Sequence, residues 1–272
     1  NAAGAGATAA PTATAGAAAG AADASGATAA SAPAAPLPTP VLMEQIAHEL
    51  AYKDALTPED FAFLTLQGYI PLGVAQGEGG LAVLSLMPVK PGLAPVLAFR
   101  GTEVGTKTED VKADMQSQGI GMGQYAANKG MIAIQMALLS RFGRIHATGH
   151  SLGGALAQIA ACDRPDLVGN VTTFQAPAID KGMVDKLDQW NAQAGEKGMA
   201  PVQSDHHVVS TDVVHRAGEA HTSGKTTEYQ GVGAADAHFS FPVTGAWQQA
   251  GGNAAMLPAQ GTQGVSTAPV AP

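Results

Sequence analysis

The chain has 272 residues, with 14 basic and 22 acidic side chains and a formal net charge of −8 at pH 7. Its few Lys and Arg residues do not gather into a stripe, so we do not expect it to bind nucleic acid. It also has no run of about 18 large apolar residues, so no transmembrane helix is expected.

The two ends of the chain differ in composition from its middle. Residues 1–40 are rich in Ala, Gly and Pro, with one charged side chain, Asp23, and one large apolar side chain, Leu37. Such a segment buries too little surface to offset the entropy of ordering, which predicts a disordered linker. Residues 251–272 have a similar texture, which predicts a low-complexity tail. This leaves residues 41–250 as the folded domain.

Apolar periodicity predicts alternating helices and strands along this domain. Helices are expected over residues 42–51, 58–66, 124–142, 152–162 and 180–193. Strands are expected over residues 81–87, 95–99, 145–148, 171–174 and 207–211. Thr57 and Pro58 have the residue types of a helix N-cap and first helical position. The alternation predicts an α/β fold with a mostly parallel sheet and helices on both faces.

The segment Gly149-His150-Ser151-Leu152-Gly153 fits the G-x-S-x-G pattern and lies between a predicted strand and a predicted helix. A tight strand-to-helix turn strains the backbone of the serine, so the residues two before and two after it must be small. A serine hydroxyl needs a neighbouring base to act as a nucleophile. We therefore predict Ser151 as the nucleophile of a hydrolase, the alternative being a chance glycine-rich turn.

Several motifs, taken together, resemble the class 3 (fungal-type) lipase family. They are Phe99–Thr102, Gly149–Ala157 and Thr173–Pro177, followed by Asp212–His215, which lacks the prolines common in the family's acid-bearing segment. The resemblance covers roughly residues 95–240. It implies an α/β-hydrolase fold and the hydrolysis of carboxylic esters, so that residues 41–250 would form the catalytic domain.

The acid of the catalytic triad must follow the serine and precede the histidine in this fold. Asp212 follows a predicted strand, and such sheets hold their ligands at strand ends, so we predict Asp212 as the acid. Asp205, in a predicted loop, and Asp180, at a helix start, are weaker candidates.

Three histidines follow Asp212 and compete for the role of base. His215 is close to Asp212 in sequence, which leaves little chain for a return to Ser151. His221 resembles a loop histidine that precedes the catalytic one in the family, and His238 resembles the family's late histidine. We predict His238 as the base and keep His221 as the alternative.

The oxyanion formed during acyl transfer needs donors already directed at it. The backbone N–H of Leu152, directly after the nucleophile, is one expected donor. The resemblance implies that Thr102 provides a second backbone N–H and a hydroxyl. We expect no metal or organic cofactor in this mechanism.

Two other features carry simpler interpretations. Cys162 is the only cysteine, which excludes a disulfide within the chain, and it ends an apolar-rich run, so we expect a buried structural thiol. His206 and His207 are adjacent on a predicted strand and must point to opposite faces, so we reject a metal site there. His150 is expected to be structural.

The substrate is less closely defined. The resemblance implies a lid over residues 104–124. The first part of this segment is too charged to form a broad apolar face, and its glycines could act as hinges. The alternative is a plain surface loop. This favours an esterase or phospholipase, with a lipid or other ester as substrate and transient contact with a membrane surface. The terminal composition, without a visible signal peptide, suggests a domain within a longer exported or effector-like polypeptide.

Two rival functions remain open. One is a non-catalytic binding domain that keeps the hydrolase fold. The other is a serine hydrolase of amides or thioesters, because the same triad serves those reactions.

Overall fold

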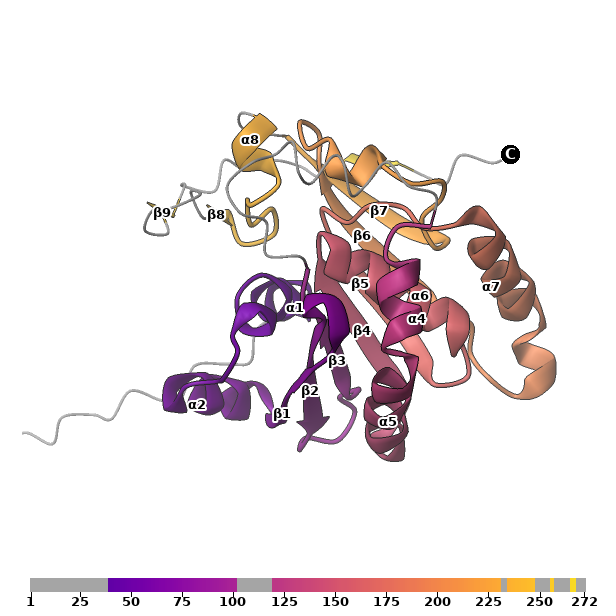
Figure 1. The fold of residues 1–272 in the computed structure, drawn as a ribbon, viewed down its shortest axis with the longest axis horizontal. Coiled ribbons are helices and arrows are strands. Elements are labelled where there is room, and N and C mark those ends of the chain that lie inside the picture. The colour runs from indigo at the N-terminus through magenta and orange to yellow at the C-terminus, as the bar shows by residue number, and fades with distance from the viewer. Residues whose placement is uncertain (1–38, 102–118, 231–233, 248–254, 257–264, 268–272) are drawn as a thin grey trace, which may run out of the picture. The chain divides into compact units, whose positions relative to one another are not determined.

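The structure is a computed structural model that describes residues 39–101, 119–230, 234–247, 255–256 and 265–267 (Figure 1). Within these ranges the main sheet has eight strands in the order β1-β2-β3-β4-β5-β6-β7-β10. The strands are β1 (Tyr69–Gln76), β2 (Ala82–Pro88), β3 (Val96–Phe99), β4 (Ile145–His150), β5 (Val168–Phe174), β6 (Gln203–Val209), β7 (Gly224–Tyr229) and β10 (Val265–Thr267). Strands β3 to β7 pair in parallel, whereas β1, β2 and β10 join by antiparallel pairing. The sheet is therefore mostly parallel, as predicted.

Helices cover both faces of this sheet (Figure 1). One hydrophobic cluster joins one face to α1 and α2, and a second cluster joins the opposite face to α4, α5, α6 and α7. The helices are α1 (Thr39–His48), α2 (Pro58–Gln67), α4 (Met122–Ala127), α5 (Lys129–Leu139), α6 (Leu152–Asp163), α7 (Lys181–Gln193) and the short α8 (Ala234–Ala237).

Strand β3 shows how the two clusters share the sheet. Val96 and Ala98 belong to the cluster under α1, whereas Leu97 and Phe99 belong to the cluster under α5 and α6. All four side chains are fully buried. A strand buried on both faces has no polar face, which explains the continuous apolar run in its sequence.

The predicted helices over residues 58–66, 152–162 and 180–193 correspond to α2, α6 and α7. Thr57 caps α2 as predicted, because its hydroxyl accepts the N–H of Asp60 and the Asp60 carboxylate accepts the N–H of Thr57. The predicted helix over residues 42–51 is α1, followed by a 3₁₀ turn at Leu50–Tyr52.

The prediction of one continuous helix over residues 124–142 is wrong. The chain forms α4 and α5 with a junction at Asn128, followed by a 3₁₀ turn at Ser140–Phe142. The Asn128 side chain accepts the Glu78 N–H at 2.7 Å and donates to the Glu78 carbonyl at 3.0 Å. This long-range pair fixes the junction, and apolar spacing alone does not reveal it.

Before residue 230, the strands β1 and β7 were not predicted, and one strand was placed incorrectly. β1 contains Pro71 and Gly73 around a register shift, and β7 is polar and only half-buried, so neither has a clear apolar pattern. The strand predicted over residues 207–211 is β6, which begins at Gln203 and ends at Val209. Asp212 therefore lies in the turn after the strand.

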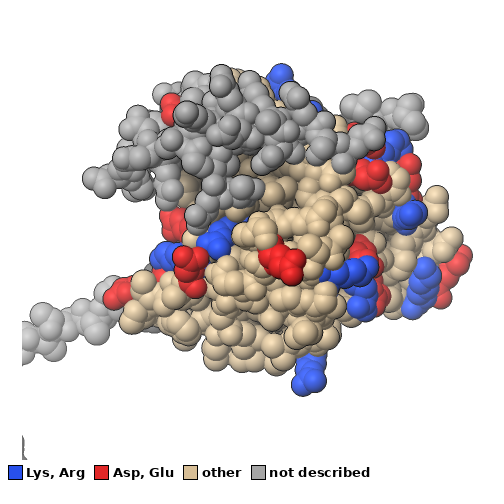
Figure 2. All heavy atoms as spheres, viewed as in Figure 1, with Lys and Arg blue, Asp and Glu red and all other residues tan. Residues whose placement is uncertain are grey.

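Parts of the predicted tail carry strands in this structure. β9 (Ala255–Met256) pairs with β8 (Ala246–Trp247), and β10 pairs with β7. Among the described residues, no helix has both the length and the apolar character that a membrane crossing requires. On the face shown in Figure 2, Lys and Arg lie beside Asp and Glu in small mixed groups.

The close packing of α6 against the sheet leads to a stability prediction. A Cβ atom at Gly154 would collide with the Cβ of Ala176 and lie 2.9 Å from the Gly149 carbonyl oxygen. We expect Gly154→Ala to lower the free energy of unfolding by about 1–3 kcal/mol, as overpacked cores do. Urea unfolding measures the change.

Gly130→Ala is the matched control for this substitution. Gly130 lies within α5, and a Cβ atom there would meet no atom within 4 Å. Because Ala is the better helix former, this variant should gain up to about 1 kcal/mol. Equal losses in the two variants would contradict the proposed role of close packing at Gly154.

Candidate active site

Ser151 occupies a strained turn between β4 and α6. Its φ of 55° and ψ of −131° lie in a region that costs an L-residue roughly 1–3 kcal/mol. A Cβ atom at Gly149 would collide with the backbone of Gly153, and one at Gly153 would collide with the carbonyl of Phe99. The turn therefore has the geometry that the G-x-S-x-G spacing predicts.

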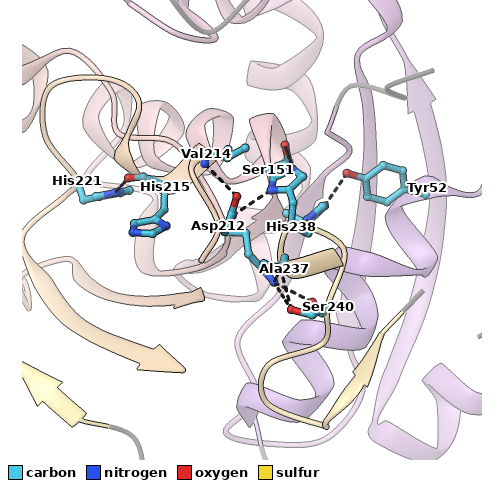
Figure 3. A network of polar contacts seen from close by, with 11 residues as sticks. Tyr52, Ser151, Asp212, Val214, His215, His221, Ala237, His238 and Ser240 are labelled. Carbon is cyan, nitrogen blue, oxygen red and sulfur yellow. Dashed lines mark hydrogen bonds and ion pairs between the residues drawn. The ribbon is translucent and has the colours of Figure 1, made fainter. Parts of the chain in front are cut away.

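Ser151, His238 and Asp212 form a continuous hydrogen-bonded chain (Figure 3). The Oγ of Ser151 lies 2.9 Å from Nε2 of His238, and Nδ1 of His238 lies 3.0 Å from Oδ2 of Asp212. The other carboxylate oxygen of Asp212 accepts the N–H of Val214 at 2.9 Å. All three side chains are buried, with Asp212 the least exposed at 1%.

The partners of His238 define its resting tautomer. An ionised carboxylate only accepts hydrogen bonds, so Nδ1 of His238 carries the proton shared with Asp212. This leaves Nε2 bare and able to accept the hydroxyl proton of Ser151. The arrangement can therefore remove a proton from the serine while the carboxylate stabilises the resulting imidazolium.

The predicted oxyanion donors fall partly within the described residues. Leu152 is the first residue of α6, directly after Ser151, so its N–H lies at a helix N-terminus. Thr102 lies outside the described residues. Gly101, which precedes it, is adjacent to the site, because a Cβ atom there would lie 3.4 Å from the Cβ of Ser151 and would collide with the Tyr52 hydroxyl.

Comparison with protein families identifies the group to which this arrangement belongs. Residues 82–263 match the family model described as phospholipase-like, Tle-like phospholipase domain. The chain belongs to this phospholipase-like family. A search of curated proteins found no match.

Several solved structures with a similar fold are lipases. A fungal lipase crystal structure is 13% identical over 71% of this chain and 79% of its own, with a TM-score of 0.50. The lipase of Rhizopus microsporus var. chinensis is 15% identical over 72% and 74%, with a TM-score of 0.48. The mono- and diacylglycerol lipase of Aspergillus oryzae is 16% identical over 71% and 79%, with a TM-score of 0.48. The resemblance to fungal-type lipases and the α/β-hydrolase fold are confirmed.

The loop that carries His238 in this phospholipase-like domain is held by Gln175. The Gln175 side chain donates to the carbonyl of Ala237 at 3.2 Å and to that of Ser240 at 2.8 Å. Its backbone, at a φ of 43°, directly follows β5. The motif Thr173–Pro177 therefore contains a residue that bonds to the backbone on both sides of His238. The motif alone did not predict these hydrogen bonds.

His150 connects the same loop to the sheet. Its Nε2 lies 2.7 Å from the carbonyl oxygen of His238, which only accepts, so Nε2 carries the proton. Its Nδ1 therefore accepts the hydroxyl hydrogen of Tyr52 at 2.9 Å. Burial, followed by the neighbouring His238, lowers the pKa of His150 to about 3 and keeps it neutral. These contacts agree with its predicted structural role.

Glu44 is a buried carboxylate that the sequence interpretation did not single out. It lies on α1, fully buried, and its two oxygens accept the N–H groups of Val243 and Thr244 at 2.7 Å each. Burial raises its pKa to about 7, although both hydrogen bonds oppose this shift. The sequence feature that could have indicated this residue is an acid among the apolar positions of the helix predicted over residues 42–51.

The other candidate bases and acids are not brought to Ser151. The ring of His221 lies 3.3 Å from Oε1 of Gln158 through Nδ1 and 3.1 Å from the carbonyl of His215 through Nε2. Figure 3 shows His221 and His215 on the side of Asp212 away from Ser151. The geometry therefore favours His238 over the alternative His221.

The weaker acid candidates have local partners. Asp180 accepts the N–H of Met183 and caps α7. Oδ2 of Asp205 lies 3.6 Å from Nε2 of His207 and 3.9 Å from Nζ of Lys225. Neither is hydrogen-bonded to a histidine that contacts Ser151.

The region predicted as a lid or surface loop is described only from residue 119 onward. Gly119 and Gly121 both have a φ of 79°, which suits glycine, and Ile120 between them is buried in the core. A Cβ atom at Gly121 would lie 3.3–3.5 Å from side chains of α6. The described end of this region is therefore packed against α6, and the rest lies outside the described residues.

His206 and His207 point to opposite faces of β6, as expected. Nδ1 of His206 bonds to the hydroxyl of Thr173 at 2.7 Å, whereas the ring of His207 stacks on Phe174 at 5.1 Å. Across the described part of the chain, no group of three metal-ligating side chains is found. Cys162 is partly buried against the core, and burial raises its pKa to about 12.

The buried histidines predict an acid-labile fold. Burial lowers the pKa of His146 to about 4, lowers those of His150 and His206 to about 3, and holds that of His48 well below 6.5. Below pH 6.5 these histidines bind protons in the unfolded chain but stay neutral in the folded chain. Their contribution to the free energy of unfolding is therefore fully present above pH 6.5 and is lost toward pH 3. A tenfold difference in proton affinity between the folded and unfolded chain corresponds to about 1.4 kcal/mol.

We therefore expect the free energy of unfolding to fall between pH 6.5 and about 4. Glu44 opposes this loss in part of the range, because its raised pKa means that its protonation favours the folded chain. The four histidines outnumber it, so the net change is a loss. Urea unfolding at constant ionic strength measures the trend. A free energy that stays constant or rises on acidification would contradict this account.

Proposed function

We propose that this domain is a serine hydrolase that cleaves carboxylic esters of lipids, with phospholipids as the substrate class, through an acyl-enzyme. The hydrogen-bonded chain from Ser151 through His238 to Asp212, at a strained strand-to-helix turn, carries the proposal. Membership of the phospholipase-like family supports the lipid ester as substrate.

In the proposed reaction, His238 takes the hydroxyl proton as the Oγ of Ser151 attacks the ester carbonyl carbon. The carbonyl oxygen becomes an oxyanion, which the N–H of Leu152 and the donors of Thr102 stabilise. The C–O bond to the alcohol then breaks, and His238 protonates the leaving alkoxide.

Water completes the cycle. His238 removes a proton from a water molecule, the hydroxide attacks the acyl carbon, and the Oγ of Ser151 leaves and regains its proton from His238. Each proton passes between side chains, water and substrate, so these steps need neither a metal nor an organic cofactor. Hydrolysis of a lipid in this way requires transient contact with a membrane or micelle surface.

Removal of the nucleophile tests the proposal directly. Ser151→Ala should lower kcat for p-nitrophenyl esters and phospholipids by roughly 10⁴-fold or more. Ser223→Ala, at an exposed serine bonded to Asp188, should leave kcat unchanged. A fluorophosphonate probe should label the wild type, with the label mapping to Ser151.

Other outcomes identify the rival functions. A wild type that neither hydrolyses esters nor takes the label would indicate a non-catalytic binding domain. Labelling at Ser151 with turnover of amides or thioesters only would indicate a different hydrolase.

The identity of the base has its own test. His238→Asn should lower kcat roughly 10⁴-fold, because no other group then accepts the serine proton. His221→Asn should retain activity within about tenfold, because its contacts are with Gln158 and His215. Initial rates with a soluble ester measure both variants, and the reverse ranking would assign the base to His221.

A further inference from the structure

The loop that carries His238 is attached at its far end to α1 through Glu44. The two backbone N–H groups that bond to the carboxylate belong to consecutive residues, Val243 and Thr244. The side chain of Thr244 also hydrogen-bonds to it. Hydrogen bonds to a buried charged group are roughly twice as strong as those between neutral groups, so this contact fixes the loop firmly.

A second residue of α1 contacts the same loop. His48 lies one helical turn after Glu44, and its ring is 4.5 Å from the ring of Phe241. The same ring is 4.1 Å from that of His150, whose Nε2 donates to the carbonyl of His238. α1 therefore forms a surface on which the base-bearing loop rests.

We propose that Glu44 is a positioning residue, whose ionised carboxylate holds the loop so that His238 reaches both Ser151 and Asp212, and whose protonation loosens the loop and slows ester hydrolysis. This inference rests on the proposed function of the triad. Glu44 does not contact the reacting atoms, so its effect passes through the placement of His238.

The protonation chemistry of the contact explains why charge matters. An ionised carboxylate offers an acceptor to each N–H group, whereas a protonated one turns a hydroxyl toward one of them. One buried backbone donor then loses its partner, which costs about 1–3 kcal/mol in comparable sites. The raised pKa of Glu44, about 7, places this change near neutral pH.

The titratable neighbours of Glu44 support this assignment. Glu49, past the end of α1, repels the carboxylate and contributes to its raised pKa. Tyr229, at the end of β7, is an adjacent phenol whose own pKa is raised to about 12, mainly by burial and in part by Glu44. Burial holds the pKa of His48 well below its usual value, so His48 stays neutral. Of these groups, Glu44 is the one whose charge changes near pH 7.

Glu44→Gln tests the proposal because its amide copies the protonated acid, with one acceptor and one donor. At pH 8 we expect kcat for a soluble ester to fall by about tenfold to hundredfold, as small misplacements of catalytic groups do, with KM unchanged. Below about pH 7 the wild type should lose kcat along an acid limb to which the protonation of Glu44 contributes, and the variant should lack this contribution.

Two further variants sharpen the test. Thr244→Val keeps the carboxylate and the backbone N–H groups but removes the hydroxyl that stabilises the charge. It should move the acid limb to higher pH while reaching the wild-type kcat at alkaline pH. Glu49→Gln removes an exposed acid just past the C-terminal end of α1 and should retain the loss of kcat that the protonation of Glu44 causes.

Amide hydrogen exchange separates this proposal from the proposed function. Protection factors of the Val243 and Thr244 amides should fall about tenfold in Glu44→Gln at pH 8, and in the wild type between pH 8 and pH 5, whether or not the protein hydrolyses esters. Unchanged protection would overturn the inference, as would lost protection with an unchanged pH profile of an active enzyme. An inactive wild type with the protection change intact would count against the triad alone.

Discussion

The strained backbone of Ser151 is the constraint on which the site depends. A φ of 55° is tolerated because the neighbouring chain leaves no room for another path: Gly149 faces the backbone of Gly153, and Gly153 faces the carbonyl of Phe99. The cost, roughly 1–3 kcal/mol, is offset by a sheet that is buried on both faces. At this turn the hydroxyl lies 2.9 Å from Nε2 of His238, on the chain segment that carries the base.

The base is positioned by a different principle. His238 follows the short helix α8 and lies in a loop, so no long element fixes its place. Instead, buried polar groups from three distant segments contact the loop: Gln175 after β5, His150 at the end of β4 and Glu44 on α1. Each side chain makes these bonds in one state only: His150 as one neutral tautomer, Gln175 in one amide orientation and Glu44 as the ionised carboxylate. Burial keeps His150 neutral, as its contact requires. The precision of the site comes from hydrogen bonds that are satisfied away from water.

Local chemistry explains which parts of this arrangement are predictable from sequence. The glycine spacing around Ser151, the cap at Thr57 and the apolar run of β3 each act within a few residues, and each has the predicted local form. The order of motifs pointed to Asp212 and His238, whose hydrogen bond spans 26 residues. The contacts of Glu44 span about 200 residues, and the Asn128 junction depends on Glu78, 50 residues away. Local patterns do not encode such pairs, and the polar strand β7 offered no periodicity to detect.

Glu44 also shows how stability and function can oppose each other in one residue. Because its pKa is raised in the folded chain, its favourable contribution to stability is full below the unfolded value of about 4.5 and is lost as pH rises through about 7. The ionised form that binds both loop amides is thus the form whose burial weakens the fold. The buried histidines have the reverse dependence, since their neutrality favours the fold above pH 6.5. A hydrophobic residue at position 44 would relieve the cost of burying a charge, but it would leave two backbone donors of the base-bearing loop without that acceptor.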